Sequence, residues 1–291
     1  VIGYATSTSI QKVSATVSAS APIFGGETTS KSINSVNKQY GIYVRGDADT
    51  MYAGGLIGYA TNGANISSSN NNSRIFVATG SVNGQKAYAG GLVGMIANTS
   101  NTTIISSSYA IGDIMFGAEA VIYKNNSKAE KDKFDVSKDK ITTTIFAGGL
   151  VGSTTNIRIE NVYYYGNIVA NGNYHNSNTI TLVDSVDASK KVNVYDQCTN
   201  VVNQNIGGLV GAGSCTIKYY VSNADILYDY STSATIKIGG VLGGGNDVIA
   251  QYGYNYARIK VYGDKVTRLT NQNAYSFASS INESSKGKYT V

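Results

Sequence analysis

The sequence predicts an all-β protein folded as a parallel β-solenoid, and three observations lead to this prediction. A glycine-rich hexapeptide recurs along the chain, and the segments between its copies consist of short apolar runs separated by polar turns. No segment keeps a helical stripe with a period of 3.6 residues over ten residues. We expect about nine coils of about 30 residues each, every coil burying its apolar face by stacking on its neighbours.

The composition is that of a chain that folds. Its 291 residues include 33 glycines, 23 tyrosines and a single proline, with 42% hydrophobic and 14% charged residues. Tyrosine favours strands, whereas glycine and small polar residues favour turns. The chain has no run of about 18 apolar residues of the kind that crosses a membrane as a helix. We therefore expect a folded β-rich domain with no direct membrane span in this chain.

Charge, histidine and cysteine content exclude some functions. The net charge of +5 is spread over the whole chain, without the basic stripe that grips phosphates, so we expect no nucleic-acid partner. His175 is the single histidine, so neither a zinc site nor a zinc-protease motif is predicted, and we expect no metal or cofactor. Cys198 and Cys215 lie 17 residues apart and are candidates for a disulfide.

The hexapeptide has five full copies, each with two adjacent glycines, two aliphatic residues and a closing glycine. We expect the glycine pair to allow positive φ and close approach of neighbouring coils. The aliphatic residues would fill the interior, and the closing glycine would turn the corner. The structural repeat residues are Gly54, Gly55, Gly58, Gly90, Gly91, Gly94, Gly148, Gly149, Gly152, Gly207, Gly208, Gly211, Gly239, Gly240 and Gly243.

The spacing of the copies sets the predicted period. With Gly3 as a truncated first copy, the closing glycines lie 55, 36, 58, 59 and 32 residues apart. Degenerate copies halfway along the long intervals would explain the two sizes, and three segments lie there: Phe24-Gly-Gly-Glu27, Phe116-Gly-Ala-Glu119 and the weaker Thr181-Leu-Val-Asp184. Nine coils at about 4.8 Å would form a rod roughly 40 to 45 Å long.

The predicted solenoid covers residues 1–262, and residues 263–291 form a degenerate coil or a cap. Residues 124–140 carry six lysines among four acidic residues. Because the charges largely cancel, we interpret this segment as a solvated loop inserted at a corner; the alternative is a docking site for an acidic partner. The first six residues nearly repeat Leu56–Thr61, so we expect the chain to start inside a repeat and to be a fragment of a longer polypeptide.

Copies of Gly-Gly-Leu-Val-Gly, followed by an Ile-containing strand and a Gly-x-Ile step as in Ile157–Ile168, resemble the GLUG-motif repeat proteins. The resemblance extends over residues 1 to about 262. It implies an extracellular spacer or adhesive stalk, as in secreted and cell-surface proteins. Members often have Asn-Cys-Tyr in the middle strand, where this chain has Ser107-Ser-Tyr109 and Asn161-Val-Tyr163, so no internal thiol ladder is expected.

Tyrosines cluster near the end of the predicted solenoid. Tyr252, Tyr254 and Tyr256 alternate along one strand and therefore share one face. They would form an aromatic shelf that stacks on sugars, or they would pack on one another as a ladder. The preceding step contributes Tyr219, Tyr220, Tyr228 and Tyr230.

Six asparagines begin N-x-S/T sequons and are candidates for N-glycosylation if the source has the machinery. They are Asn65, Asn71, Asn98, Asn101, Asn125 and Asn282.

Together these features predict a non-enzymatic structural or adhesive protein located outside the cell or at its surface. The expected partners are cell-surface glycans or other copies of the chain. One alternative is the subunit of an extracellular filament that assembles head to tail. Another is a carbohydrate-binding or polysaccharide-active β-helix protein, whose catalysis would need clustered carboxylates. The candidates near in sequence, Asp184, Asp187 and Asp196, need not share a face, and we predict no catalytic residues.

Overall fold

A computed structural model of the chain describes residues 2–16, 40–44, 48–79, 83–100, 102–118, 142–171, 179–183, 191–195, 201–229, 234–245, 247–262 and 274–275. All regular structure in these residues is β-strand. Sixteen strands form a large curled sheet, six form a second sheet and two form a separate pair. Pairing is parallel in the first two sheets, so the predicted all-β class with parallel strands is confirmed, and the arrangement is consistent with a β-solenoid.

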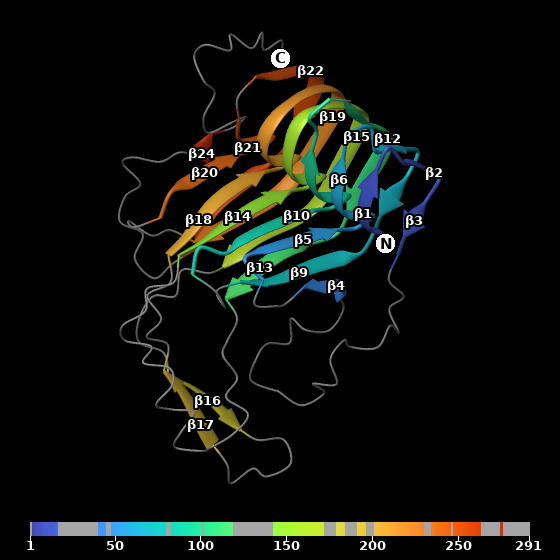
Figure 1. Cartoon of the computed structure of the whole chain (residues 1–291). Coiled ribbons are helices and arrows are strands. Elements are labelled where there is room, and N and C mark those ends of the chain that lie inside the picture. Colours follow the sequence, from blue (N-terminus) through green and yellow to red (C-terminus); the bar gives the residue numbers. More distant parts are fainter. Residues whose placement is uncertain are drawn as a thin grey trace.

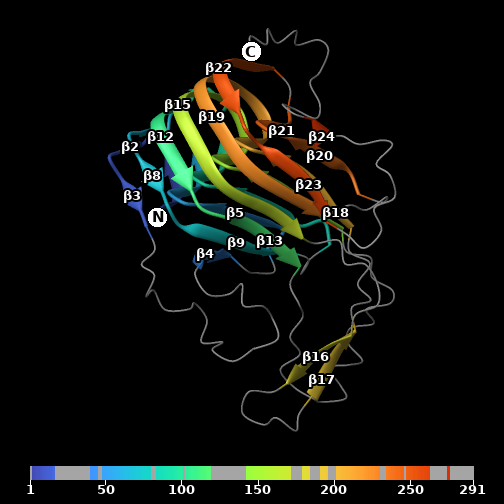
Figure 2. The same cartoon turned by 180° about the vertical axis from the view of Figure 1, so that it is seen from behind.

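The chain winds repeatedly through the same positions, so strands of successive windings lie side by side from blue to red in Figures 1 and 2. The large sheet holds three strand positions of each winding. The first has β1 (Ile2–Thr6), β6 (Ile57–Thr61), β11 (Val93–Ala97), β15 (Val151–Asn171), β19 (Val210–Asp229) and β21 (Leu242–Gly244). The second has β2 (Ser9–Gln11), β3 (Ser14–Ala15), β7 (Asn65–Ser67), β8 (Asn70–Asn71), β12 (Thr103–Ile111) and β22 (Val248–Asn255), together with the middle of β15 and β19. The third has β4 (Tyr40–Val44), β9 (Arg74–Thr79), β13 (Ile114–Ala118) and β23 (Arg258–Tyr262), with the ends of β15 and β19.

The second sheet supplies the fourth position, which leads into the next hexapeptide. Its strands are β5 (Thr50–Gly54), β10 (Lys86–Gly90), β14 (Thr142–Gly148), β18 (Val201–Gly207), β20 (Ile236–Gly239) and β24 (Ala274–Tyr275). Ala89 pairs with Ala53 on one side and with Ala147 on the other, and Ile206 and Ile238 continue the row. The five hexapeptides therefore lie in a single column, as predicted.

The predicted number of coils and their uniform length are corrected by the strand registers. Val93 pairs directly with Val151, and Val151 pairs directly with Val210, so each interval of nearly 60 residues is one winding and hides no further coil. The described residues contain six windings. Phe116 pairs with Val77 and Ala170 at the third position and does not begin a degenerate hexapeptide.

Two of the long windings differ from the short ones in the length of one connection, whereas the long first winding has its extra residues between β3 and β4. Residues 80–85 and 230–235 join the large sheet to the second sheet in two windings, whereas 119–141 and 172–200 join the same two positions in two others. The segment 172–200 includes β16 (Thr179–Val183) and β17 (Lys191–Tyr195), which pair antiparallel with each other. Thr181 therefore belongs to a separate hairpin and not to a degenerate copy.

The interior is built from rows of aliphatic side chains that run across the windings. Ile105 at the second position is flanked by Ile66 and Ile159, and all three are buried. Ile114 at the third position is flanked in the same way by Ile75 and Ile168. β-Branched side chains pack well on a pleated surface, so identical residues at equivalent positions form a continuous core. The leucines and valine after the glycine pairs are buried as well: Leu56, Leu92, Leu150, Leu209 and Val241.

The motif glycines provide space, and they do not provide the positive φ that we expected. The described glycines with positive φ are Gly63, Gly84, Gly112, Gly166 and Gly213, none of them in a hexapeptide. A Cβ on Gly149 would lie 2.1 Å from the carbonyl oxygen of Gly208 and 2.3 Å from the Tyr164 ring. The closing glycine does not turn the corner either, because Gly58 is the second residue of β6 and the bend falls on Gly55 and Leu56.

Three other predicted segments lie wholly or partly outside the residues that the structure describes. The charged segment 124–140 and the segment Phe24–Glu27 lie outside the described residues. Of residues 263–291, the structure describes β24, which pairs with β20 and so adds a strand to the second sheet.

Candidate ligand-binding groove

A row of polar residues crosses five windings on the outside of the large sheet. It consists of the residue immediately before the isoleucine at the third position of each of these five windings. Asn167 pairs with Asp225, and Asp225 pairs with Arg258, so these residues are direct neighbours across the strands. At about 4.8 Å per winding the row is roughly 19 Å long. We call it the polar ladder, and its members are Arg74, Asp113, Asn167, Asp225 and Arg258.

The local sequence explains why these side chains face outward. In a strand successive residues point to opposite faces, and the isoleucine that follows a ladder residue, such as Ile114 or Ile168, is buried in four windings. Ile259, after Arg258, is partly buried and packs against the core. Gly112 and Gly166 precede Asp113 and Asn167 and have φ of 149° and 157°. A Cβ on Gly166 would lie 2.5 Å from the Gly112 carbonyl oxygen, so glycine permits both the conformation and the close approach.

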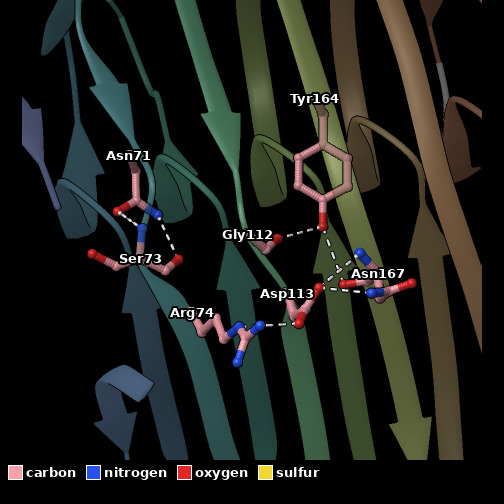
Figure 3. A network of polar contacts seen from close by, with 7 residues as sticks. All are labelled: Asn71, Ser73, Arg74, Gly112, Asp113, Tyr164 and Asn167. Carbon is pink, nitrogen blue, oxygen red and sulfur yellow. Dashed lines mark hydrogen bonds and ion pairs between the residues drawn. The ribbon is translucent and has the colours of Figure 1, made fainter. Parts of the chain in front are cut away.

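Hydrogen bonds and ion pairs connect one winding to the next along the polar ladder (Figure 3). The Arg74 Nε lies 3.2 Å from Asp113 Oδ2. Asp113 Oδ1 accepts hydrogen bonds from the backbone N of Asn167 at 3.2 Å and from its Nδ2 at 2.8 Å. At the other end, two nitrogens of Arg258 donate to the two carboxylate oxygens of Asp225. These hydrogen bonds and the nearby carboxylate charge raise the pKa of Arg258.

Tyr164 lies beneath the polar ladder as a fully buried ring. Its hydroxyl donates a hydrogen bond to the carbonyl oxygen of Gly112 at 2.9 Å or to that of Asn167 at 3.1 Å (Figure 3). Burial, with a smaller contribution from the Asp113 carboxylate, raises the pKa of Tyr164 well above its usual value. The hydroxyl therefore stays neutral and holds two windings together at the bend that carries the ladder.

A groove with a volume of about 300 Å³ runs along the polar ladder. Ladder residues line it together with Gly112 and Gly166, whose missing side chains leave the space open. Tyr165 and Asn223, which are neighbours in the register, also contribute to its lining. The groove thus combines two Arg–Asp pairs of zero net charge with amide groups and an aromatic ring. Such a surface offers hydrogen-bond donors and acceptors without a dominant charge.

Exposed tyrosines cover the neighbouring part of the same face. Tyr252, Tyr254 and Tyr256 are 58%, 65% and 59% exposed, and the shared face predicted for all three stays a prediction. Tyr254 and Tyr256 have parallel rings 6.1 Å apart, and Tyr219 stacks on Tyr252 with a 5.2 Å centroid separation. Tyr220 and Tyr228 are buried and do not join this surface, and Tyr230 lies outside the described residues. We call Tyr219, Tyr252, Tyr254 and Tyr256 the tyrosine face.

Two members of the tyrosine face have an uncommon backbone conformation. Tyr219 and Tyr252 have φ of 53° and 57°, at a corner where neighbouring windings have Ser107 and Asn161 with φ of 47° and 56°. Asparagine tolerates this left-handed region well, whereas a bulky residue there is strained. Both tyrosines are nevertheless exposed, so packing in the core does not explain their presence at the corner.

The predicted glycosylation sites separate into different environments. Asn71 and Asn98 are 1% and 7% exposed. The Nδ2 of Asn71 donates to the Ser73 carbonyl oxygen, and that of Asn98 donates to the Asn156 carbonyl oxygen. A glycan on either amide is incompatible with this folded environment. Asn65 is exposed in β7, and the remaining candidates, Asn101, Asn125 and Asn282, lie outside the described residues.

Cys215 is a free, buried cysteine at the second position of its winding. Burial raises the pKa of its thiol to about 12. Cys198 lies outside the described residues, so the disulfide between them stays a prediction.

Sequence reasoning did not identify the polar ladder. Its members are far apart in the chain, and each is a single polar residue next to an isoleucine. A signal was nevertheless present, because Gly112-Asp113 and Gly166-Asn167 each precede an apolar run beginning with isoleucine. Aligning the windings on that isoleucine places the five residues in one row.

The model of the GLUG motif family matches residues 49–75. The matched stretch includes β5, the first full hexapeptide and the strands that follow it, up to Ile75 in β9. The predicted resemblance to GLUG-motif repeat proteins is confirmed over this stretch. No curated protein and no solved structure matches the chain significantly. Within the described residues there is no helix long and apolar enough to cross a membrane.

Proposed function

We propose that this chain is a non-enzymatic structural and adhesive element of an extracellular surface protein. The observation that carries the proposal is the tyrosine face, which is displayed on windings held in strict register. Aromatic rings with a polar tip are well suited to contact surfaces, because each buries a large apolar area at little cost in side-chain entropy. The GLUG resemblance supports the extracellular setting.

The stacked fold suits a structural role. Each inner winding forms backbone hydrogen bonds with the windings on both sides, and the motif glycines bring the windings into backbone contact. Such a stack places contact residues of several windings at fixed spacings, and preorganised side chains lose little freedom on binding. We therefore expect the tyrosine face to act as one rigid surface.

An adhesion assay tests this function. Beads coated with the purified chain are applied to panels of bacterial and animal cells, and retention under flow is measured. A triple variant, Tyr252→Ser, Tyr254→Ser and Tyr256→Ser, is expected to reduce retention about tenfold, because these side chains supply the exposed aromatic area. The matched control is Tyr4→Ser, which removes a tyrosine of similar exposure from the first winding. Equal retention of the triple variant and the parent chain, or no retention of the parent, would contradict the proposal.

The proposal that the chain is not an enzyme is tested separately. The chain is incubated with a panel of polysaccharides, and newly formed reducing ends are measured. We expect no release above a heat-denatured sample. Turnover that is saturable with substrate would show that the protein is a polysaccharide-active enzyme.

The alternative of a head-to-tail filament is suggested by the parallel stacking, in which each winding offers its strand edges to the next winding. Open strand edges are surfaces on which a second copy can add its own strands. Sedimentation velocity over a range of concentrations tests this alternative, and a monodisperse monomer throughout would exclude it.

A further inference from the structure

We infer that the groove along the polar ladder binds a neutral glycan chain, with Tyr165 as a stacking platform and the ladder residues as hydrogen-bonding partners. The inference names a ligand class for the proposed adhesive function, on which its biological setting rests. The site is distinct from the tyrosine residues varied in the adhesion assay, and its residues come from five successive windings.

The charge pattern selects against ionic ligands. The ladder holds two arginines and two aspartates, and each aspartate is already paired with an arginine. An anion would have to compete with a carboxylate for each guanidinium, and a cation would have to compete with a guanidinium for each carboxylate. A ligand with many hydroxyl groups avoids this competition, because every hydroxyl both donates and accepts a hydrogen bond.

The ladder side chains have open surface for such a ligand. The side chains of Arg74 and Arg258 are 48% and 68% exposed. Charge-assisted hydrogen bonds from fixed side chains are stronger than neutral ones and are directional. The pairs with Asp113 and Asp225 hold both guanidinium groups in place before a ligand arrives, which lowers the entropic cost of binding.

Tyr165 supplies an aromatic ring at the groove for contact with a sugar. Tyr165 lines the groove and is 58% exposed, and Asn223 is its neighbour in the next winding. A sugar ring has an apolar face of C–H groups and a rim of hydroxyls. An exposed tyrosine ring beside a row of polar groups matches both parts at once. The volume of about 300 Å³ suits a short stretch of a glycan chain, which would lie across the windings along the ladder.

Isothermal titration with neutral hexasaccharides tests the inference. The probes are cellohexaose, maltohexaose, chitohexaose and mannohexaose, with a heparin hexasaccharide as the charged comparison. We expect at least one neutral probe to bind with a Kd below about 1 mM and with little dependence on salt. Tyr165→Ser should weaken this binding about tenfold, because the stacking platform is lost.

Two further variants keep the test decisive. Asn223→Trp fills the groove without removing a ladder residue and should abolish binding, while Tyr4→Ser on the first winding should leave the Kd unchanged. The inference is overturned if no neutral probe binds at about 5 mM, if the heparin probe binds in their place, or if Tyr165→Ser binds as tightly as the parent. If the chain supports adhesion but binds no hexasaccharide, this inference is wrong and the proposed function stands. If the chain binds a hexasaccharide but supports no adhesion, the proposed function is wrong and this inference stands.

Discussion

Gly54 of one winding lies directly against Gly94 of the next, so that a Cβ on Gly54 would be 2.7 Å from the Gly94 backbone nitrogen. The same contact between the first glycine of one hexapeptide and the closing glycine of the next recurs three times. It joins Gly90 with Gly152, Gly148 with Gly211, and Gly207 with Gly243. Repetition of the motif therefore has a steric cause, because two side-chain-free residues must meet wherever windings stack.

Substitution of Gly149 by alanine is expected to destabilise the fold by about 3 kcal/mol. The new methyl group would overlap the Gly208 carbonyl oxygen and the Tyr164 ring, and neither can move without shifting a strand. Urea unfolding of the Gly149→Ala variant measures the loss.

The control for this prediction is Gly3→Ala. Gly3 is the counterpart of the closing glycines in the first winding, but a Cβ there would meet nothing within 4 Å. We expect a change within about 0.5 kcal/mol. If both variants lost the same stability, close packing would not be the reason for glycine in the motif.

Removal of the Tyr164 hydroxyl is expected to cost about 1 kcal/mol, because Tyr164→Phe removes the donor of a part-buried hydrogen bond to the carbonyl oxygen of Gly112 or Asn167. The matched substitution is Tyr4→Phe, at an exposed ring, which should be neutral. Thermal or urea unfolding compares the two. A Tyr164→Phe variant as stable as the parent would show that the hydroxyl does not hold the windings together.

The buried Cys215 thiol predicts a loss of stability at alkaline pH. Its pKa is raised from 9.0 to about 12, so between these values the unfolded chain loses a proton that the folded chain keeps. Stability from this group is complete below pH 9 and falls by about 1.4 kcal/mol per pH unit as the pH rises toward 12. Under reducing conditions, Cys215→Ala should show a shallower decline of the unfolding free energy over this range. Parallel curves would mean that the thiol is accessible to water in the folded chain.

Glycosylation provides a test of burial at the sequons. When the chain is secreted from a eukaryotic host, we expect glycan at Asn65 and none at Asn71 or Asn98 in the folded product. Peptide mapping by mass spectrometry measures the occupancy at each site. High occupancy at Asn71 in a natively folded sample would contradict the interior placement of that side chain.

Local sequence patterns predicted the stacking of the windings, because the contacts that create it are repeated in the sequence. Gly54 and Gly90 are in register because their hexapeptides match, and the isoleucines at 105 and 159 are in register for the same reason. The number of coils was not predictable in this way. Stacking requires only that equivalent strands meet, so it places no limit on the length of the chain between them.

The polar ladder could not be found by reading the chain linearly. Asp113 and Asn167 are 54 residues apart, and their hydrogen bonds exist only because two successive windings are stacked in register. The tyrosine face was predictable in part, because Tyr252, Tyr254 and Tyr256 alternate within a short stretch of the sequence. Burial of Tyr220 and Tyr228 was not, since it depends on where each corner turns.

The connections between the large sheet and the second sheet differ in length, and this difference has a consequence for the architecture. In two windings this connection has six residues, 80–85 and 230–235, and in two others it comprises 119–141 and 172–200. The strands before and after the connection stay in the same rows of the two sheets. The length of this connection therefore varies between windings without changing the register of the strands on either side of it. The extra residues of a long winding therefore lie in the chain between paired strands, and the register of the strands themselves is unchanged.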